Sequence, residues 1–454
     1  MRIKLSIKLM LSEIREHIEA TTEYPRDALI EYICFDTRET ENGDLFIALS
    51  GKHDSGEKYV TEQLCKKAWV ITTKPIAGAL CVKDTGAALL ALAKYYKRKL
   101  KSLKYTVAIT GSVGKTTTKE FVNILLSKKY KTHKSFANQN NEIGVPITVL
   151  QAAADTEVLI AEVGMNHSGE ISRISDSLKP DVSVITNIGT AHIGNLGSRE
   201  AIAAAKLEIK KGMQNGILIT PSDEPLLNLH ANRTFSVCDK NASFCITKNK
   251  IFEDSFFRAT HSFSLVEDHF LLCLAAAVST ARCLSLEYDE IKDAISQISY
   301  NNTRQKITQI DKYYILEDYY NASLESIRSN LDALSKASGF TLRNVLLGDV
   351  LELGELSYDI HRKIGEATAE YNIDKLFLYG KYSGFVKEGA LSRGFPSRFI
   401  FVNEDISAPE ITAQQIIDNV TAGEIILFKA SHDMHLENIQ KILLSNSQMT
   451  KGKE

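Results

Sequence analysis

A stretch beginning at residue 110 holds the residue types that bind phosphate. It reads Thr-Gly-Ser-Val-Gly-Lys-Thr-Thr, follows a β-rich run at 105–109 and precedes apolar residues with helical spacing at 121–126. Glycines let backbone N–H groups crowd a polyphosphate at a helix N-terminus, a lysine reaches the β/γ-phosphates and a hydroxyl ligates Mg²⁺. A glycine turn before a surface helix is the alternative, but the flanking strand and helix favour a nucleotide site. The residues expected to bind the nucleotide there are Gly111, Ser112, Gly114, Lys115, Thr116 and Thr117.

Polar side chains stand where two later β-rich runs end. Glu162 ends the run 157–162, and Asn187 and His192 follow the run 182–186. Functional groups of parallel sheets gather at the carboxyl ends of the strands, and a carboxylate there suits Mg²⁺. Taken alone, His192 would be a loop hydrogen-bonder, and Lys206, in an alanine-rich helical run, would be a solvated charge.

The alternation of strand-like and helix-length runs predicts an α/β fold with parallel sheets. The length of 454 residues calls for more than one core. We expect three domains: a small N-terminal α/β domain for substrate at 1–82, a central P-loop ATPase-like sheet at 83–302, and a Rossmann-like domain at 303–454. The helical run 84–100 is expected to bridge the first two domains.

Composition indicates a soluble cytoplasmic protein. With a net charge of −2, the chain has no excess of positive charge that would indicate binding to nucleic acid or an anionic membrane. The seven cysteines form no C-x-x-C pair and are expected to be reduced thiols. Charged residues interrupt the N-terminal apolar run, so neither a signal peptide nor a membrane span is expected.

Several motifs together resemble the Mur ligases, ATP-dependent amide-forming enzymes of peptidoglycan assembly. One of these motifs is the phosphate loop, T-G-S-x-G-K-T-T. It is shorter than the general pattern G-x-x-x-x-G-K-[ST], whose first glycine would fall at Ile109. The segments 138–146 (N-x-N-N-x-I-G-V-P) and 347–361 (L-G-D-V-L-E-L-G-E onward) are similar to the member that adds D-alanyl-D-alanine. The segments 36–51, 317–322 and 427–439 extend the resemblance over nearly the whole chain.

The resemblance implies roles for individual residues. Lys115, Glu162, His192 and Lys206 would be catalytic, with Lys206 carbamylated, and Mg²⁺ would be held by Thr116, Glu162, His192 and Lys206. His269, Arg304 and Asp318 would contact ATP beside the phosphate loop. Asp36, Thr37 and Arg38 would meet a UDP-sugar. The remaining substrate-binding residues would be Asn138, Asn141, Asn166, Tyr320, Asn321, Asp349 and Lys429.

The chain departs from the family pattern at some ligand contacts. Phe270 and Cys273 stand where the family has two asparagines that contact adenine, so either apolar contacts hold the base or it binds weakly. His432 replaces an arginine, and Gly194 stands where a glutamate is frequent. In the N-terminal region, Ser55 and Glu57 replace an aspartate and a histidine; phosphate and metal residues are retained.

The expected function is ATP-driven addition of D-alanyl-D-alanine to UDP-N-acetylmuramoyl-tripeptide through an acyl phosphate. The cofactors would be ATP and Mg²⁺, the partners small molecules only, and the protein a cytoplasmic monomer. Two alternatives stay open: a Mur-like ligase that joins another amine and carboxylate, or a catalytically degenerate nucleotide-binding paralogue. The altered adenine contacts motivate the second alternative, whereas the retained Lys115, Glu162 and Lys206 argue against it.

Overall fold

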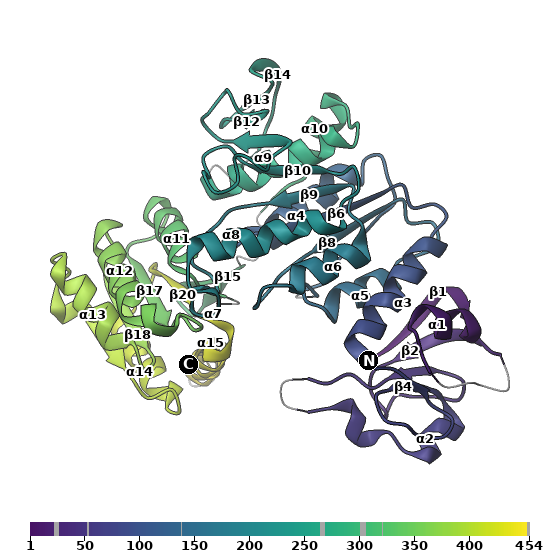
Figure 1. Cartoon of the computed structure of the whole chain (residues 1–454). Helices are drawn as coiled ribbons and strands as arrows, with labels where there is room; N and C mark the ends of the chain where they lie inside the picture. The colour runs from purple at the N-terminus through teal and green to yellow at the C-terminus, as the bar shows by residue number, and fades with distance from the viewer. Residues whose placement is uncertain are drawn as a thin grey trace.

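The computed structural model describes residues 1–21, 27–51, 54–137, 139–263, 268–299, 306–319 and 321–451. These residues form an α/β fold with three separate sheets. The N-terminal and C-terminal units lie apart from each other, and each lies against the central unit (Figure 1). The three-domain α/β fold expected from the alternating sequence pattern is confirmed. No helix in the described parts of the chain has the length and apolar composition needed to cross a membrane.

The N-terminal sheet has five strands in the order β1-β2-β3-β4-β5. Only β1 and β2 pair antiparallel; the remaining pairs are parallel. The strands are β1 (Arg2–Met10), β2 (Leu29–Cys34), β3 (Leu45–Ile47), β4 (Trp69–Thr72) and β5 (Leu80–Cys81), with helices α1 (Leu11–His17) and α2 (Glu62–Lys67).

Helix α3 (Thr85–Lys99) joins this unit to the central one, as its position in the sequence predicted. Asp84 caps it by accepting a hydrogen bond from the Ala87 N–H (2.7 Å). The buried Tyr96 hydroxyl donates to the Ala152 carbonyl (3.0 Å) and accepts from the Ile7 N–H (3.3 Å). One side chain therefore connects strand β1, α3 and the central unit.

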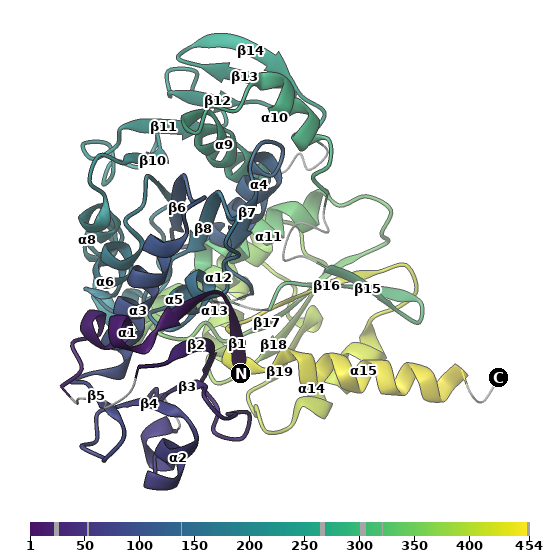
Figure 2. The ribbon, with the colours of Figure 1, turned by 90° about the vertical axis from the view of Figure 1, so that its right-hand side faces the viewer.

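The central sheet has nine strands in the order β14-β13-β12-β11-β10-β9-β6-β8-β7. Pairing is parallel from β7 to β12, whereas β12, β13 and β14 pair antiparallel. This antiparallel edge, at the end far from the N-terminal sheet (Figure 2), was not expected from the sequence. The strands are β6 (Tyr105–Thr110), β7 (Thr132–Lys134), β8 (Val158–Glu162), β9 (Val182–Ile185), β10 (Ile217–Pro221), β11 (Arg233–Ser236), β12 (Phe244–Ile246), β13 (Lys250–Glu253) and β14 (Phe256–Thr260).

Helices α4 to α8 of the central unit follow parallel strands, whereas α9 and α10 follow the antiparallel strand β14. Apolar side chains of β6, α4 and α9 form one buried cluster, and this packing holds α4 against the sheet. The helices are α4 (Lys115–Leu126), α5 (Gly144–Leu150), α6 (Glu170–Leu178), α7 (Ile193–Leu196), α8 (Arg199–Leu207), α9 (Asp268–Cys283) and α10 (Tyr288–Ile295).

The C-terminal sheet has six strands in the order β15-β16-β20-β17-β18-β19, parallel except for the β15–β16 pair. The strands are β15 (Lys306–Ile310), β16 (Tyr313–Glu317), β17 (Arg343–Gly348), β18 (Lys375–Tyr379), β19 (Ile400–Asn403) and β20 (Ile425–Lys429). The helices are α11 (Leu324–Lys336), α12 (Ser357–Glu370), α13 (Ser383–Ser392), α14 (Pro409–Asn419) and α15 (Leu436–Lys451).

Helices α12 and α13 pack closely because each presents a glycine to the backbone of the other. A Cβ at Gly365 would lie 1.8 Å from the Val386 carbonyl oxygen, and a Cβ at Gly389 would lie 1.9 Å from the Arg362 carbonyl oxygen. A Cβ at Gly384, also on α13, would meet only a flexible side-chain atom at 3.7 Å. The first two glycines are therefore required by packing.

We expect Gly365→Ala to lower the stability of the C-terminal unit by about 2 kcal/mol, because backbone atoms must separate to admit the methyl group. The matched control Gly384→Ala should leave the urea concentration at the midpoint of unfolding unchanged or raise it slightly, because alanine favours a helix more than glycine does. Urea denaturation followed by circular dichroism measures both. Equal midpoints for the two variants would contradict the packing account.

Candidate active site

The phosphate loop joins β6 to α4, as the sequence predicted. Gly111 (φ +148°) and Gly114 (φ +81°) adopt backbone conformations that favour glycine, and a Cβ at Gly111 would lie 1.8 Å from Thr186 Oγ1. The Lys115 Nζ donates to the carbonyls of Gly111 (2.7 Å) and Ser112 (3.2 Å). No side chain caps the N-terminus of α4, so its dipole faces the loop. This geometry suits a polyphosphate.

Glu162 lies beside this loop at the end of β8 and is fully buried. Its Oε2 accepts a hydrogen bond from Thr116 Oγ1 (2.7 Å), and its Oε1 accepts from Asn140 Nδ2 (2.9 Å). The Lys119 Nζ lies 3.9 Å from Glu162 Oε2. The Thr116 hydroxyl and the Glu162 carboxylate are hard oxygen donors next to the phosphate loop, so this pair fits Mg²⁺.

His192 and Lys206 occupy different surroundings. The His192 Nδ1 lies 2.6 Å from Glu352 Oε2 of the C-terminal unit, and its backbone is left-handed (φ +63°). Lys206 is 2% exposed, and burial lowers the pKa of its amine well below the usual value, with the positive charge of Lys115 lowering it further. Among the described residues, no three His, Cys, Asp or Glu side chains cluster as a ready metal site. Unmodified Lys206 has no side-chain oxygen, so the metal-binding role predicted for it depends on carbamylation.

The C-terminal unit completes the cavity around the phosphate loop. Asp318, Asn321 and Lys429 line it together with loop residues, and the Lys429 Nζ donates to Asp318 Oδ2 (2.9 Å). The structure thus brings these three predicted residues to the cavity that the phosphate loop lines. Arg304 and Tyr320, predicted for the same region, and Asn138 lie outside the described residues.

The first turns of α9 form the apolar wall of the cavity. His269, Phe270, Leu272 and Cys273 line it. The Cys273 Sγ faces the phosphate loop, because a Cβ at Gly114 would lie 3.1 Å from it, and burial raises the pKa of this thiol to about 11. Phe270 and Cys273 therefore give this wall apolar surface where the family has amides.

Asn141 and Asn166 line a second cavity, between the N-terminal and central units, together with Ser50 and Asp84. The Asn141 Oδ1 also accepts from the N–H groups of Ile143 (3.1 Å) and Gly144 (2.8 Å), so it caps the entry to α5.

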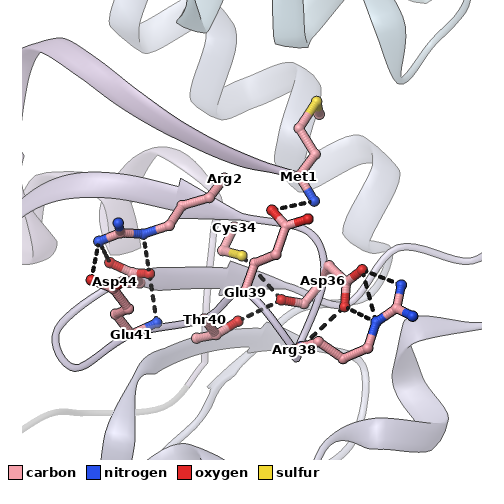
Figure 3. Close-up of polar contacts among 9 residues, drawn as sticks. All are labelled: Met1, Arg2, Cys34, Asp36, Arg38, Glu39, Thr40, Glu41 and Asp44. Carbon is pink, nitrogen blue, oxygen red and sulfur yellow. Dashed lines mark hydrogen bonds and ion pairs between the residues drawn. The ribbon is translucent and has the colours of Figure 1, made fainter.

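The segment around Asp36 lies on the surface of the N-terminal sheet (Figure 3). The Arg38 guanidinium donates to both Asp36 oxygens, Nη2 to Oδ2 at 2.6 Å and Nε to Oδ1 at 2.9 Å. This pairing holds the pKa of Asp36 well below its usual range. The Arg38 side chain remains 87% exposed, so it can meet an anion from solvent. Thr37 separates the two residues.

The contacts of three residues at the site were not predicted from the sequence. The Asn187 Oδ1 accepts from the N–H groups of Ser112 (3.0 Å) and Val113 (2.9 Å); its place at a strand end was the available signal. Glu352 lies in a recognised motif, but its contact with His192 did not follow from the motif. Glu325, which accepts from Thr190, carried no local signal at all.

Comparison with known proteins shows to which protein family this chain belongs. Residues 109–277 match the family described as Mur ligase middle domain. Over 97% of this chain, the sequence is 32% identical to the UDP-N-acetylmuramoyl-tripeptide–D-alanyl-D-alanine ligase of Bacillus subtilis (strain 168), of which 99% is covered. The ligase of the same name from Synechocystis is 30% identical, with 98% of this chain and 99% of that protein covered.

Solved structures of MurF ligases have the same fold as this chain. Crystal structure I of MurF from Acinetobacter baumannii superposes with a TM-score of 0.85 at 25% identity, covering 98% of this chain and 100% of that one. The MurF ligase of Thermotoga maritima in complex with ADP superposes with a TM-score of 0.74 at 25% identity, covering 92% and 98%. The chain therefore belongs to the Mur ligase family, within its branch of UDP-N-acetylmuramoyl-tripeptide–D-alanyl-D-alanine ligases. As such it is an ATP-dependent, amide-forming ligase of peptidoglycan precursor synthesis.

Asp349 has an environment that makes stability depend on pH. It is 5% exposed, accepts from the Tyr382 N–H (3.0 Å), and burial raises the pKa of its carboxyl to about 6. Because this folded-state pKa lies above the unfolded value, the native protein retains a proton that the unfolded chain releases. Stability therefore falls as pH rises from about 4 to about 6.

We expect Asp349→Asn to remove a stability loss of about 2 kcal/mol between pH 4 and pH 6.5. Urea denaturation across this range measures it. Asp359→Asn, an exposed acid on α12, controls for the loss of one charge. Identical pH profiles for the two variants would refute this origin of the dependence.

Proposed function

We propose that this chain joins D-alanyl-D-alanine to UDP-N-acetylmuramoyl-tripeptide at the expense of ATP, with Mg²⁺. The observation that carries the proposal is the single cavity lined by the phosphate loop of the central unit and by Asp318, Asn321 and Lys429 of the C-terminal unit. A nucleotide and an incoming amine can meet there. The full-length similarity to ligases with that name supports the choice of substrates.

The phosphate loop orients the triphosphate. Its backbone N–H groups and the Lys115 ammonium face the β/γ-phosphates, where negative charge develops in the transition state. Thr116 and Glu162 would hold Mg²⁺, which would neutralise negative charge on the phosphates. The Lys119 Nζ, 3.9 Å from Glu162 Oε2, places a positive charge beside this carboxylate.

The reaction proceeds in two displacements. A terminal carboxylate oxygen of the tripeptide attacks the γ-phosphorus, the bond from that phosphorus to the β–γ bridging oxygen breaks, and ADP leaves. The amine nitrogen of D-alanyl-D-alanine then attacks the acyl carbon, phosphate leaves, and the amine loses a proton. The C-terminal unit excludes water from the acyl phosphate.

Lys206 supplies an oxygen ligand after it reacts with carbon dioxide. Its amine is buried and has a lowered pKa, so the neutral form that attacks the carbon of CO₂ is populated. The new N–C bond forms with loss of one proton to water, and a carboxylate results. Together with His192 and Glu162, this carbamate would hold a second Mg²⁺.

We assign one role to each of the three units. Residues 1–82 with Asp36, Thr37 and Arg38 receive the UDP-sugar, 83–302 bind ATP, and 303–454 receive the dipeptide. Asn141, Asn166 and Asp349 contact substrates, and His269 contacts the nucleotide. The protein works as a cytoplasmic monomer on small molecules, without nucleic acid or membrane.

Phosphate release with each substrate omitted in turn tests the reaction. We expect release only when ATP, Mg²⁺, UDP-N-acetylmuramoyl-tripeptide and D-alanyl-D-alanine are all present. Lys115→Ala should reduce kcat by at least about 100-fold, because it removes a charge that stabilises the transition state. Silence of the wild-type protein with the complete mixture would reject these substrates.

Carbamylation is tested directly by ¹³C NMR of protein equilibrated with ¹³C-bicarbonate. The wild-type spectrum should contain a carbamate signal that is absent from Lys206→Ala, and kcat of that variant should fall at least about 100-fold. Lys210→Ala, an exposed neighbour, should keep both signal and activity. A wild-type spectrum without the signal would contradict the modification.

A further inference from the structure

The loop between β9 and α7 contacts the phosphate loop on one side. The Asn187 Oδ1 accepts from Ser112 and Val113, as described above, and the Gly189 N–H donates to Ser112 Oγ (2.9 Å). The Thr186 hydroxyl also donates to the Val113 carbonyl (2.6 Å). The conformation of the phosphate loop is thus held by residues 186–189.

The same loop contacts the C-terminal unit on its other side, through Thr190 and Glu325 of α11. Both donors of Thr190 are used: its N–H donates to Glu325 Oε1 (2.9 Å) and its hydroxyl to Glu325 Oε2 (3.0 Å). Glu325 lies in the first turn of α11, which a reciprocal Ser323–Ser326 capping box fixes. One carboxylate therefore joins α11 to the residue directly after Gly189.

A second contact lies four residues further along. The Gly194 N–H donates to the Glu352 carbonyl (3.0 Å), and a Cβ at Gly194 would lie 2.4 Å from that oxygen and 2.6 Å from the Gly354 nitrogen. These are backbone atoms, which cannot rotate away. The glycine at 194 thus permits the C-terminal unit to dock on this loop.

We propose that Glu325 is a positioning residue that couples docking of the C-terminal unit to nucleotide binding. It acts through Thr190 on the loop that holds Ser112 and Val113, and it is not among the described residues that line the nucleotide cavity. This inference rests on the proposed function, since it assigns the nucleotide to that cavity.

The coupling follows from thermodynamic linkage. If docking stabilises the loop conformation that binds phosphate, then a bound nucleotide must stabilise docking by the same factor. Breaking the Glu325–Thr190 contact should weaken both. A residue that serves only the stability of α11 would lower the melting temperature without changing nucleotide affinity.

The test measures binding of Mg²⁺ and a non-hydrolysable ATP analogue to the full chain by calorimetry. We expect Glu325→Ala to raise the Kd about five- to tenfold, and Glu325→Gln, which keeps one acceptor oxygen, to raise it less. Glu410→Ala, an exposed acid of the same unit on α14, should stay within about twofold of wild type.

A double-mutant cycle tests the route. Thr190→Val should weaken binding of the analogue as Glu325→Ala does. The double variant should bind it no more weakly than either single variant, because both changes remove the same contact. Small-angle X-ray scattering should show a more extended chain for Glu325→Ala, and the analogue should compact it. Gly194→Ala, which blocks docking sterically, provides an independent variant with the same expected behaviour.

Wild-type affinity in Glu325→Ala, or multiplicative effects of the two single changes, would overturn the coupling. If Glu325→Ala does not fold, Glu325→Gln and Gly194→Ala decide the question in the same assays. A wild-type protein that binds no analogue would reject the proposed function itself, whereas a wild type that binds and variants that match it reject only this inference.

Discussion

The parallel pairing of β6 with β8 and β9 is the constraint on which the site depends. Ile109 pairs with Glu162, and Thr110 pairs with Ile185. All three strands therefore end at the same edge of the sheet, and the phosphate loop, Glu162 and Asn187 emerge side by side. The contacts from Glu325 and Glu352 of the C-terminal unit are made to Thr190 and His192, which follow β9 at this edge.

Burial of charge at this edge has a cost that the surrounding groups offset. Glu162 is fully buried, yet a hydroxyl, an amide and the nearby Lys119 ammonium satisfy its oxygens. Lys206 is buried without a hydrogen bond among the described residues, and its amine accordingly favours the neutral form. The two groups respond differently to the same low-dielectric setting because only one has partners.

The departures from the family pattern have local physical reasons in two cases. Gly194 replaces a larger residue where the backbone of Glu352–Gly354 leaves no room for a Cβ. Cys273 fills the space behind Gly114, where its thiol contacts the phosphate loop. Phe270 contributes apolar surface to the same wall. Nothing in the structure explains why His432 replaces an arginine.

The sequence by itself determined the strands of the parallel sheets, the three-domain α/β class and the phosphate loop, because apolar periodicity and glycine spacing are local signals. It also identified Glu162 and Asp318, whose places at strand ends follow from that periodicity. The antiparallel edge β12–β14 was missed, since its short strands have weak patterns. Only the tertiary structure revealed that Glu325 meets Thr190, that Glu352 meets His192 and that Gly194 lies against backbone. These pairs are separated by more than 130 residues, and their contact depends on how two sheets dock, which local residue patterns do not encode.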